Sequence, residues 1–171
     1  TWNGSSWTEV ANLNTTRSLL ASAGASNTSA LAAGGFSLPS TSHAQTELWN
    51  GSSWTEVADL NQGRRDWAGS NGTQTSALVY GGTNDPPSYA LTESWNGSSW
   101  TEVADLNVAT ISGAGAGADN TSALQFGGNT GSPVAKTELW NGSSWAETTD
   151  LSTARRNLAG TGTQASALAF G

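Results

Sequence analysis

The hexapeptide Trp-Asn-Gly-Ser-Ser-Trp occurs four times in this chain and constrains its fold more than any other feature. The copies begin at Trp2, Trp49, Trp95 and Trp140, at steps of 47, 46 and 45 residues. Residues 49–61 reappear unchanged at 95–107. A repeat of this length is one supersecondary unit, which buries its apolar face only against copies of itself. The sequence therefore predicts a repeat architecture.

A single repeat contains the signals for four short antiparallel strands. Small residues at 112–117 indicate an inner strand, and an apolar run at 122–126 indicates the second. Residues 137–140 alternate polar and apolar side chains, and residues 145–151 return as the fourth strand after an Asn-Gly turn. Four such strands in about 45 residues are typical of a β-propeller blade. A helical solenoid is the structural alternative, but the glycine pairs and Asn-Gly turns would interrupt its helices.

The same signals recur in every repeat and identify the residues that we expect to be structural. A four-residue loop at 141–144 would place Trp140 directly opposite Trp145 on one face of the sheet. Double glycines end the second strands, and a tryptophan opens each fourth strand. We expect these tryptophans to be core residues between blades. The structural set is Trp7, Trp54, Trp100, Trp145, Gly34, Gly35, Gly81, Gly82, Gly127 and Gly128.

The two chain ends carry complementary parts of one repeat. The chain opens within a third strand and ends just after a second strand. We therefore predict an all-β fold, a β-propeller with four blades of four antiparallel strands, in which the N-terminal strands close the last blade. The predicted blades are residues 14–60, 61–106, 107–151, and 152–171 together with 1–13. Two alternatives remain, in which the ends are cuts in a longer array or two chains share a larger ring.

Composition excludes several classes of partner and cofactor. The net charge of −7 argues against a nucleic-acid partner and against attraction to anionic membranes. No apolar run is long enough to span a bilayer, so we expect no membrane insertion. The chain has no Cys and begins without Met, which suggests a piece of a longer protein. We favour an extracellular or virion-surface location.

The order of these signals resembles the kelch repeat of the galactose-oxidase-like propellers. The resemblance rests on the glycine pairs, the strand-three aromatics Trp2, Trp49, Trp95 and Trp140, and the tryptophans that open strand four. The strand-three residue is usually Tyr in kelch repeats, the third-to-fourth strand turn is longer there, and six or seven blades are usual. The hexapeptide arrays also resemble repeats of uncharacterised marine phage and bacterial surface proteins.

Groups that could support catalysis are sparse. His43, the only histidine, lies in a Ser/Thr/Pro-rich loop, where we expect an exposed side chain without a role. Asp85 and Asp119 are isolated, so the sequence offers no calcium loop. The copper site of galactose oxidase needs Cys and more than one His. We therefore expect no enzyme activity, no cofactor and no metal. The repeated glutamates are expected on the surface of outer strands: Glu47, Glu56, Glu93, Glu102, Glu138 and Glu147.

The copies differ most in two connections that we expect on one face of the disc. These are the loops between strands two and three (residues 36–45, 83–91 and 129–135) and the segments that lead into strand one. The kelch resemblance implies that arginines of the lead-in segments contact acidic partners. The alternative is that each Arg packs on a blade and pairs with Asp59, Asp105 or Asp150. The candidate ligand-binding residues are Arg17, Arg64, Arg65, Trp67, Tyr89, Arg155 and Arg156.

These observations favour a non-catalytic binding or structural propeller module, part of a larger surface or virion protein. Its partner would be a protein or glycan on the loop face, and it would be a monomeric ring or an oligomer that shares a larger ring. One alternative is a multivalent lectin that uses Trp67, Tyr89 or the Trp-Asn-Gly turn, because aromatic faces stack on sugars and repeated weak sites give avidity. Another is a synthetic consensus repeat with no natural ligand.

Overall fold

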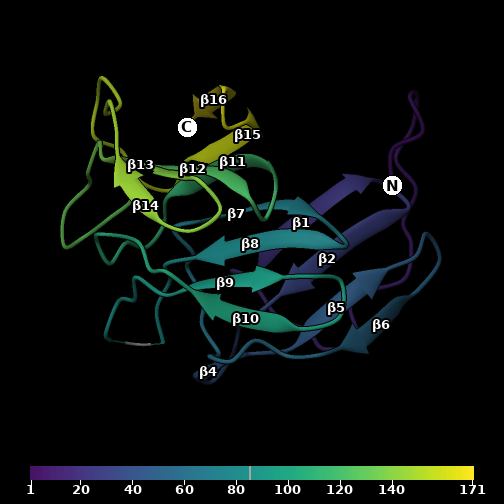
Figure 1. Ribbon diagram of the computed structural model, residues 1–171. Helices are drawn as coiled ribbons and strands as arrows, with labels where there is room; N and C mark the ends of the chain where they lie inside the picture. The colour runs from purple at the N-terminus through teal and green to yellow at the C-terminus, as the bar shows by residue number, and fades with distance from the viewer. Residues whose placement is uncertain (85) are drawn as a thin grey trace.

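The chain folds into antiparallel sheets, each built from one sequence repeat (Figure 1). The computed structural model describes residues 1–84 and 86–171. Within these residues every regular element is a strand, and no helix occurs. The all-β class and the four-strand repeat predicted from the sequence are confirmed.

Three sheets have four strands each, hydrogen-bonded as neighbours in chain order. The first contains β1 (Ala21–Ser26), β2 (Ser29–Ala33), β5 (Thr46–Trp49) and β6 (Trp54–Val57). The second contains β7 (Gly69–Thr73), β8 (Ser76–Tyr80), β9 (Thr92–Trp95) and β10 (Trp100–Val103). The third contains β11 (Ala114–Asp119), β12 (Ser122–Phe126), β13 (Thr137–Trp140) and β14 (Trp145–Glu147). Two hairpins complete the strands, β3 (Phe36–Ser37) with β4 (Thr41–Ser42), and β15 (Ala159–Thr163) with β16 (Ser166–Phe170), which we call the C-terminal hairpin.

The repeated hexapeptide forms the tight turn between the third and fourth strands of each sheet. Trp49 pairs directly with Trp54, and their rings lie 5.4 Å apart. Oδ1 of Asn50 accepts hydrogen bonds from the backbone N–H groups of Ser52 and Ser53, both at 2.9 Å. Gly51 takes a φ of 96°, a backbone conformation that carries little strain for a residue without a side chain. The hexapeptide is therefore a turn whose backbone N–H groups are bonded within the turn itself, with an aromatic pair at its base.

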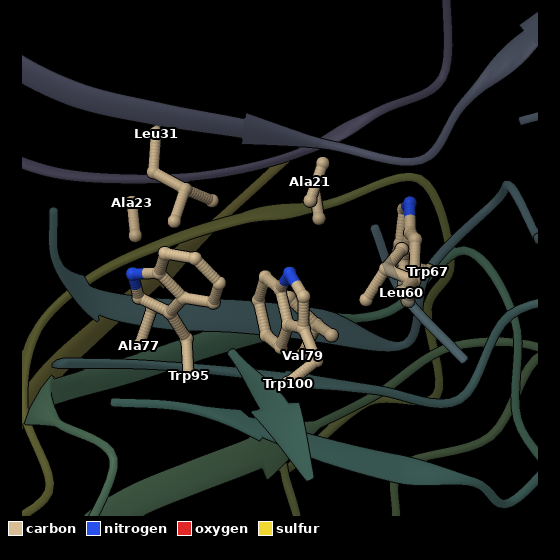
Figure 2. Packing of buried hydrophobic residues seen from close by; sticks show 10 residues of the cluster. Ala21, Ala23, Leu31, Leu60, Trp67, Ala77, Val79, Trp95 and Trp100 are labelled. Carbon is tan, nitrogen blue, oxygen red and sulfur yellow. The ribbon is translucent and has the colours of Figure 1, made fainter. Parts of the chain in front are cut away.

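The hydrophobic core lies between consecutive sheets. Trp100 of the second sheet packs against Leu31 and Ala33 of the first, and Figure 2 shows its indole and that of Trp95 beneath Ala21, Ala23 and Leu31. Trp145 of the third sheet packs in the same way on Leu78 and Tyr80 of the second. Trp100 is 7% exposed and Trp145 is 6% exposed. The expected core role of these two tryptophans is confirmed.

The first strands of the four repeats line one open cavity, which we call the channel. Residues of β1, β7, β11 and β15 together line a cavity of about 610 Å³. Glycine lets these strands approach closely, since a Cβ on Gly160 would lie 2.6 Å from the carbonyl oxygen of Gly115. The four repeats thus curve around a common axis with small residues innermost.

At one mouth of the channel, each repeat places one non-glycine residue in the left-handed backbone region. The φ angles are 54° at Leu19, 52° at Asp66, 54° at Ser112 and 55° at Asn157. The N–H of Ser112 donates to the carbonyl of Asp66 at 3.0 Å, and that of Asn157 donates to Ser112 at 2.8 Å. Backbone hydrogen bonds between these residues therefore join the second, third and fourth repeats.

The chain ends supply two half-sheets. Trp2 pairs with Trp7, and we call residues 2–7 the N-terminal hairpin. Nδ2 of Asn27, in the β1–β2 turn, donates to the carbonyl of Trp2 at 3.4 Å. Figure 1 shows this purple segment beside the first sheet, whereas the yellow C-terminal hairpin lies beside β11. The two half-sheets therefore flank the array of three complete sheets.

Several sequence predictions differ from the structure in detail. The inner strand expected at 112–117 is β11, Ala114–Asp119, because the left-handed Ser112 precedes it. The fourth strand ends at Glu147 rather than at 151. Trp7 is 78% exposed and Trp54 is half-buried, since no complete sheet covers either indole. Pairing of the N-terminal residues with the C-terminal hairpin is not among the strand pairs of residues 1–84 and 86–171.

Candidate functional site

The two variable connections lie side by side at one end of the sheets, as the sequence predicts. A backbone bridge joins Arg65, in the lead-in to β7, to Thr83 in the loop after β8. The same bridge joins Ser18 to Phe36 in the first repeat, and Ile111 to Asn129 in the third. We call the surface formed by these loops and lead-in segments the loop face. The hexapeptide turns lie at the other end, where a side chain on Gly51 would meet Thr28 of the β1–β2 turn.

Arg64 is buried beneath the loop face. Its Nη2 lies 2.9 Å from Oε1 of Glu93, and Nη1 donates to the carbonyls of Gly81 at 2.6 Å and Leu91 at 2.7 Å. Its guanidinium also stacks 4.6 Å from the ring centre of Trp67. Desolvation lowers the pKa of Arg64, and the Glu93 carboxylate opposes that shift. The cation joins strands three and two of the second sheet rather than facing a partner.

Arg17 has the equivalent position in the first repeat. Its Nη2 lies 3.1 Å from Oε1 of Glu47, and both side chains are fully buried. Desolvation lowers the pKa of Arg17, with the charge of Glu47 acting in the opposite direction. The expectation that lead-in arginines pair with carboxylates is met here by strand-three glutamates, not by Asp59. Asp105 and Asp150 instead accept the backbone N–H of Thr92 and of Thr137.

The expected surface placement is wrong for three of the repeated glutamates. Glu47, Glu93 and Glu138 are buried. Each accepts a backbone N–H from an asparagine at the start of its lead-in segment, respectively Asn14, Asn61 and Asn107. The other members, Glu56, Glu102 and Glu147, are exposed as expected. The buried glutamates therefore fasten each lead-in segment to its own sheet.

The third repeat has lost the arginine and replaces one of its contacts. Thr110 stands where the other repeats have Arg17 and Arg64. Nε2 of the buried Gln125 donates to the carbonyl of Gly127 at 2.8 Å, as Nη1 of Arg64 donates to Gly81 in the second repeat. Nδ2 of Asn107 donates to Glu138 at 2.7 Å, as Nδ2 of Asn61 does to Glu93 in the second repeat. The third repeat thus keeps the bond to the glycine carbonyl with a neutral donor.

The remaining predicted residues differ in accessibility. Arg156 is exposed and Arg155, whose Nη1 donates to the Gly171 carbonyl at 3.0 Å, is half-buried. Arg65 stacks 4.2 Å from the ring centre of Phe36 and donates to Oγ of Ser42. Tyr89 is half-buried, whereas Trp67 is buried between sheets and presents no aromatic face to a sugar.

His43 is half-buried rather than exposed. Its Nε2 lies 2.7 Å from Oγ of Ser37, and its Nδ1 lies 3.0 Å from Oε1 of Gln45. The histidine thus orders the β3–β4 loop. Oδ1 of Asp119 accepts two hydrogen bonds from Thr121, which lower the pKa of that carboxyl. Asp85, the other isolated aspartate, lies outside the described residues.

The part of the chain that the structure describes contains neither a candidate metal-binding cluster nor a membrane-spanning helix. No group of three or more His, Asp or Glu side chains there could hold a metal ion. The same residues contain no helix long and apolar enough to cross a membrane.

Comparison with known proteins assigns no family. No protein-family model matches the chain, and no curated protein matches it either.

Proposed function

We propose that this protein is a non-catalytic, kelch-like β-propeller module that binds an acidic partner through the loop face. Four blades form the disc, and the N-terminal hairpin completes the last blade. The module belongs to a larger surface or virion protein.

The observation that supports the binding proposal is that some arginines are buried in ion pairs whereas another is exposed. The recurring cations Arg17 and Arg64 are used inside the sheets, in ion pairs with Glu47 and Glu93. Among the lead-in arginines that differ between repeats, Arg156 is exposed on the loop face, whereas Arg65 is half-buried against Phe36. In a chain of net charge −7, this places an exposed positive charge where the repeats diverge. An acidic protein segment or an anionic glycan fits that surface best.

Two observations support a closed disc. The first strands of all four repeats line one channel. The turn amide of each later repeat donates to the strand-three tryptophan of the preceding sheet, as Gln74 does to Trp49 at 2.7 Å. Asn27 makes the same contact to Trp2. The N-terminal hairpin thus has the position of strands three and four of a sheet that precedes the first.

Binding of an Asp/Glu-rich peptide, measured by titration calorimetry, tests the function. We expect Arg156→Gln to weaken binding about fivefold, the loss of one charge-assisted contact. Lys136→Gln is the matched control, because it removes the same charge from a lysine already paired with Glu147 at 2.5 Å. Equal losses in both variants, or no binding by the unmodified protein, would sink the proposal. Binding of neutral sugars on a glycan array, with no acidic peptide bound, would favour the lectin instead.

A further inference from the structure

A small cavity lies between the third sheet and the C-terminal hairpin. Its volume is about 140 Å³. Its apolar lining is Leu124, Phe126, Leu151, Ala167 and Ala169, and its polar lining is Thr137, Thr149 and Asp150. We call this cavity the end socket.

The two complete interfaces between sheets have an indole at the corresponding place. Between the first and second sheets, Nε1 of Trp100 donates to Oγ1 of Thr46 at 2.9 Å. Between the second and third, Nε1 of Trp145 donates to Oγ1 of Thr92 at 3.1 Å. The ring of Trp145 also meets Tyr80 edge-on, with centroids 4.8 Å apart. At both interfaces the strand-four tryptophan thus lies on the preceding sheet, where its indole donates to a threonine of strand three.

The end socket repeats this environment without the indole. Thr137 occupies the position of Thr46 and Thr92, and Phe126 occupies that of Tyr80. Oγ1 of Thr137 is buried and has no hydrogen-bond partner. A buried hydroxyl without a partner is costly, and here it is the acceptor that an indole N–H satisfies at the other interfaces. The polar atom and the apolar walls together specify the missing group.

Trp7 lacks such a seat and is the most exposed of the four strand-four tryptophans. It is 78% exposed, although its hairpin already has the conformation of the others. The rings of Trp2 and Trp7 lie 5.6 Å apart, compared with 5.4 Å for Trp140 and Trp145. The hairpin therefore presents a pre-formed indole.

We infer that the end socket binds the indole of Trp7 from the same chain, with Nε1 of Trp7 donating to Oγ1 of Thr137. This inference rests on the closed disc proposed above. The same chain is the occupant because β1 and β15 face one channel, which brings the half-sheets at the two ends toward each other. Closure also covers Leu168 and Phe170, which are 61% and 50% exposed in the open arrangement.

The repeats fix the register of closure. In each complete sheet the leucine of strand two pairs with the residue before the strand-three tryptophan. These pairs are Leu31 with Leu48, Leu78 with Ser94, and Leu124 with Leu139. The corresponding pair at the chain ends is Leu168 with Thr1. Because the chain contains no cysteine, Thr1→Cys and Leu168→Cys together introduce one possible disulfide.

Oxidation of this double variant tests which chain fills the socket. We expect a monomeric disulfide species with altered mobility on a non-reducing gel, and little of it when Cys replaces Ser5 instead of Thr1. Covalent dimers would overturn the inference in favour of a second copy. No cross-link would also overturn it. Neither outcome depends on an external ligand, so the loop-face proposal is tested separately.

Free indole tests the seat itself. In Trp7→Ala the socket is vacant, and we expect saturating indole to raise the melting temperature by about 3 °C. Adding Thr137→Val to that variant should abolish most of the increase, because the hydrogen-bond acceptor is lost. The unmodified protein should not respond, since Trp7 occupies the socket. An equal response in the unmodified protein and in Trp7→Ala would show that Trp7 does not fill it.

Discussion

Arg64 and Glu93 form an ion pair of 2.9 Å in which both side chains are buried. Removing one member leaves the other charge uncompensated inside the second sheet. We expect Arg64→Met to destabilise the protein by about 3–5 kcal/mol in urea unfolding. The double variant with Glu93→Gln should lose less than Arg64→Met alone. A double variant that is less stable than either single variant would contradict this account.

Trp100 is the test of packing between sheets. Its indole is 7% exposed and donates to Thr46 across the interface. We expect Trp100→Ala to cost roughly 3–5 kcal/mol, because it leaves a cavity and an unsatisfied hydroxyl. Trp54→Ala is the matched control, and it should cost clearly less because Trp54 is only half-buried. An unchanged melting temperature in Trp100→Ala would remove the assignment of this residue to the core.

The buried Tyr80 makes stability sensitive to alkaline pH. Desolvation raises the pKa of its hydroxyl far above the usual value of about 10. The folded protein therefore favours the neutral form, and this contribution is complete below pH 10 and is lost as the pH rises above it. In a Tyr89→Phe background, we expect phenolate absorbance to appear only together with unfolding. Adding Tyr80→Phe should flatten the decrease in stability above pH 10, and an unchanged decrease would contradict this.

The third repeat offers a test of how Gln125 compensates for the missing arginine. Gln125 already bonds to the Gly127 carbonyl, the contact that Arg64 makes to Gly81. We expect Thr110→Arg alone to be destabilising by about 1–3 kcal/mol, because it adds volume beside an occupied acceptor. Combining it with Gln125→Val, which copies Val79 of the second repeat, should recover stability and supply Glu138 with a cation. Additive effects in the double-mutant cycle would rule out the compensation.

Local patterns in the sequence were sufficient to predict the strands but not the burial and pairing of the charged residues. The alternation at 137–140 and the Asn-Gly turn predicted β13, its hairpin and the Trp140–Trp145 pair, since both depend on neighbours in sequence. Glu47 alternates in its strand like a surface residue, yet it is buried. Its partner Arg17 lies on a distant segment, and only the folded repeat brings them together. Joint recurrence of Arg and Glu in the first two repeats was the available signal.

The placement of Trp67 could not be predicted for a similar reason. The residue is unique to the second repeat, and that made it a candidate binding residue. Its indole lies against Arg64 and in the core between the first and second sheets, which depends on how successive sheets stack. Divergence between copies therefore marks both exposed loops and local adjustments of packing.

The four left-handed residues at one end of the channel hold their place through the backbone, whereas their side chains differ in chemistry. Its hydrogen bonds use backbone atoms alone, as between Ser112 and Asp66. The same backbone position carries Leu19 in the first repeat and Asn157 in the last. A substitution there can change the charge or polarity of the opening while the bonds between repeats persist. Each repeat thus contributes one side chain to this end of the cavity, and its chemical character can change while the backbone stays the same.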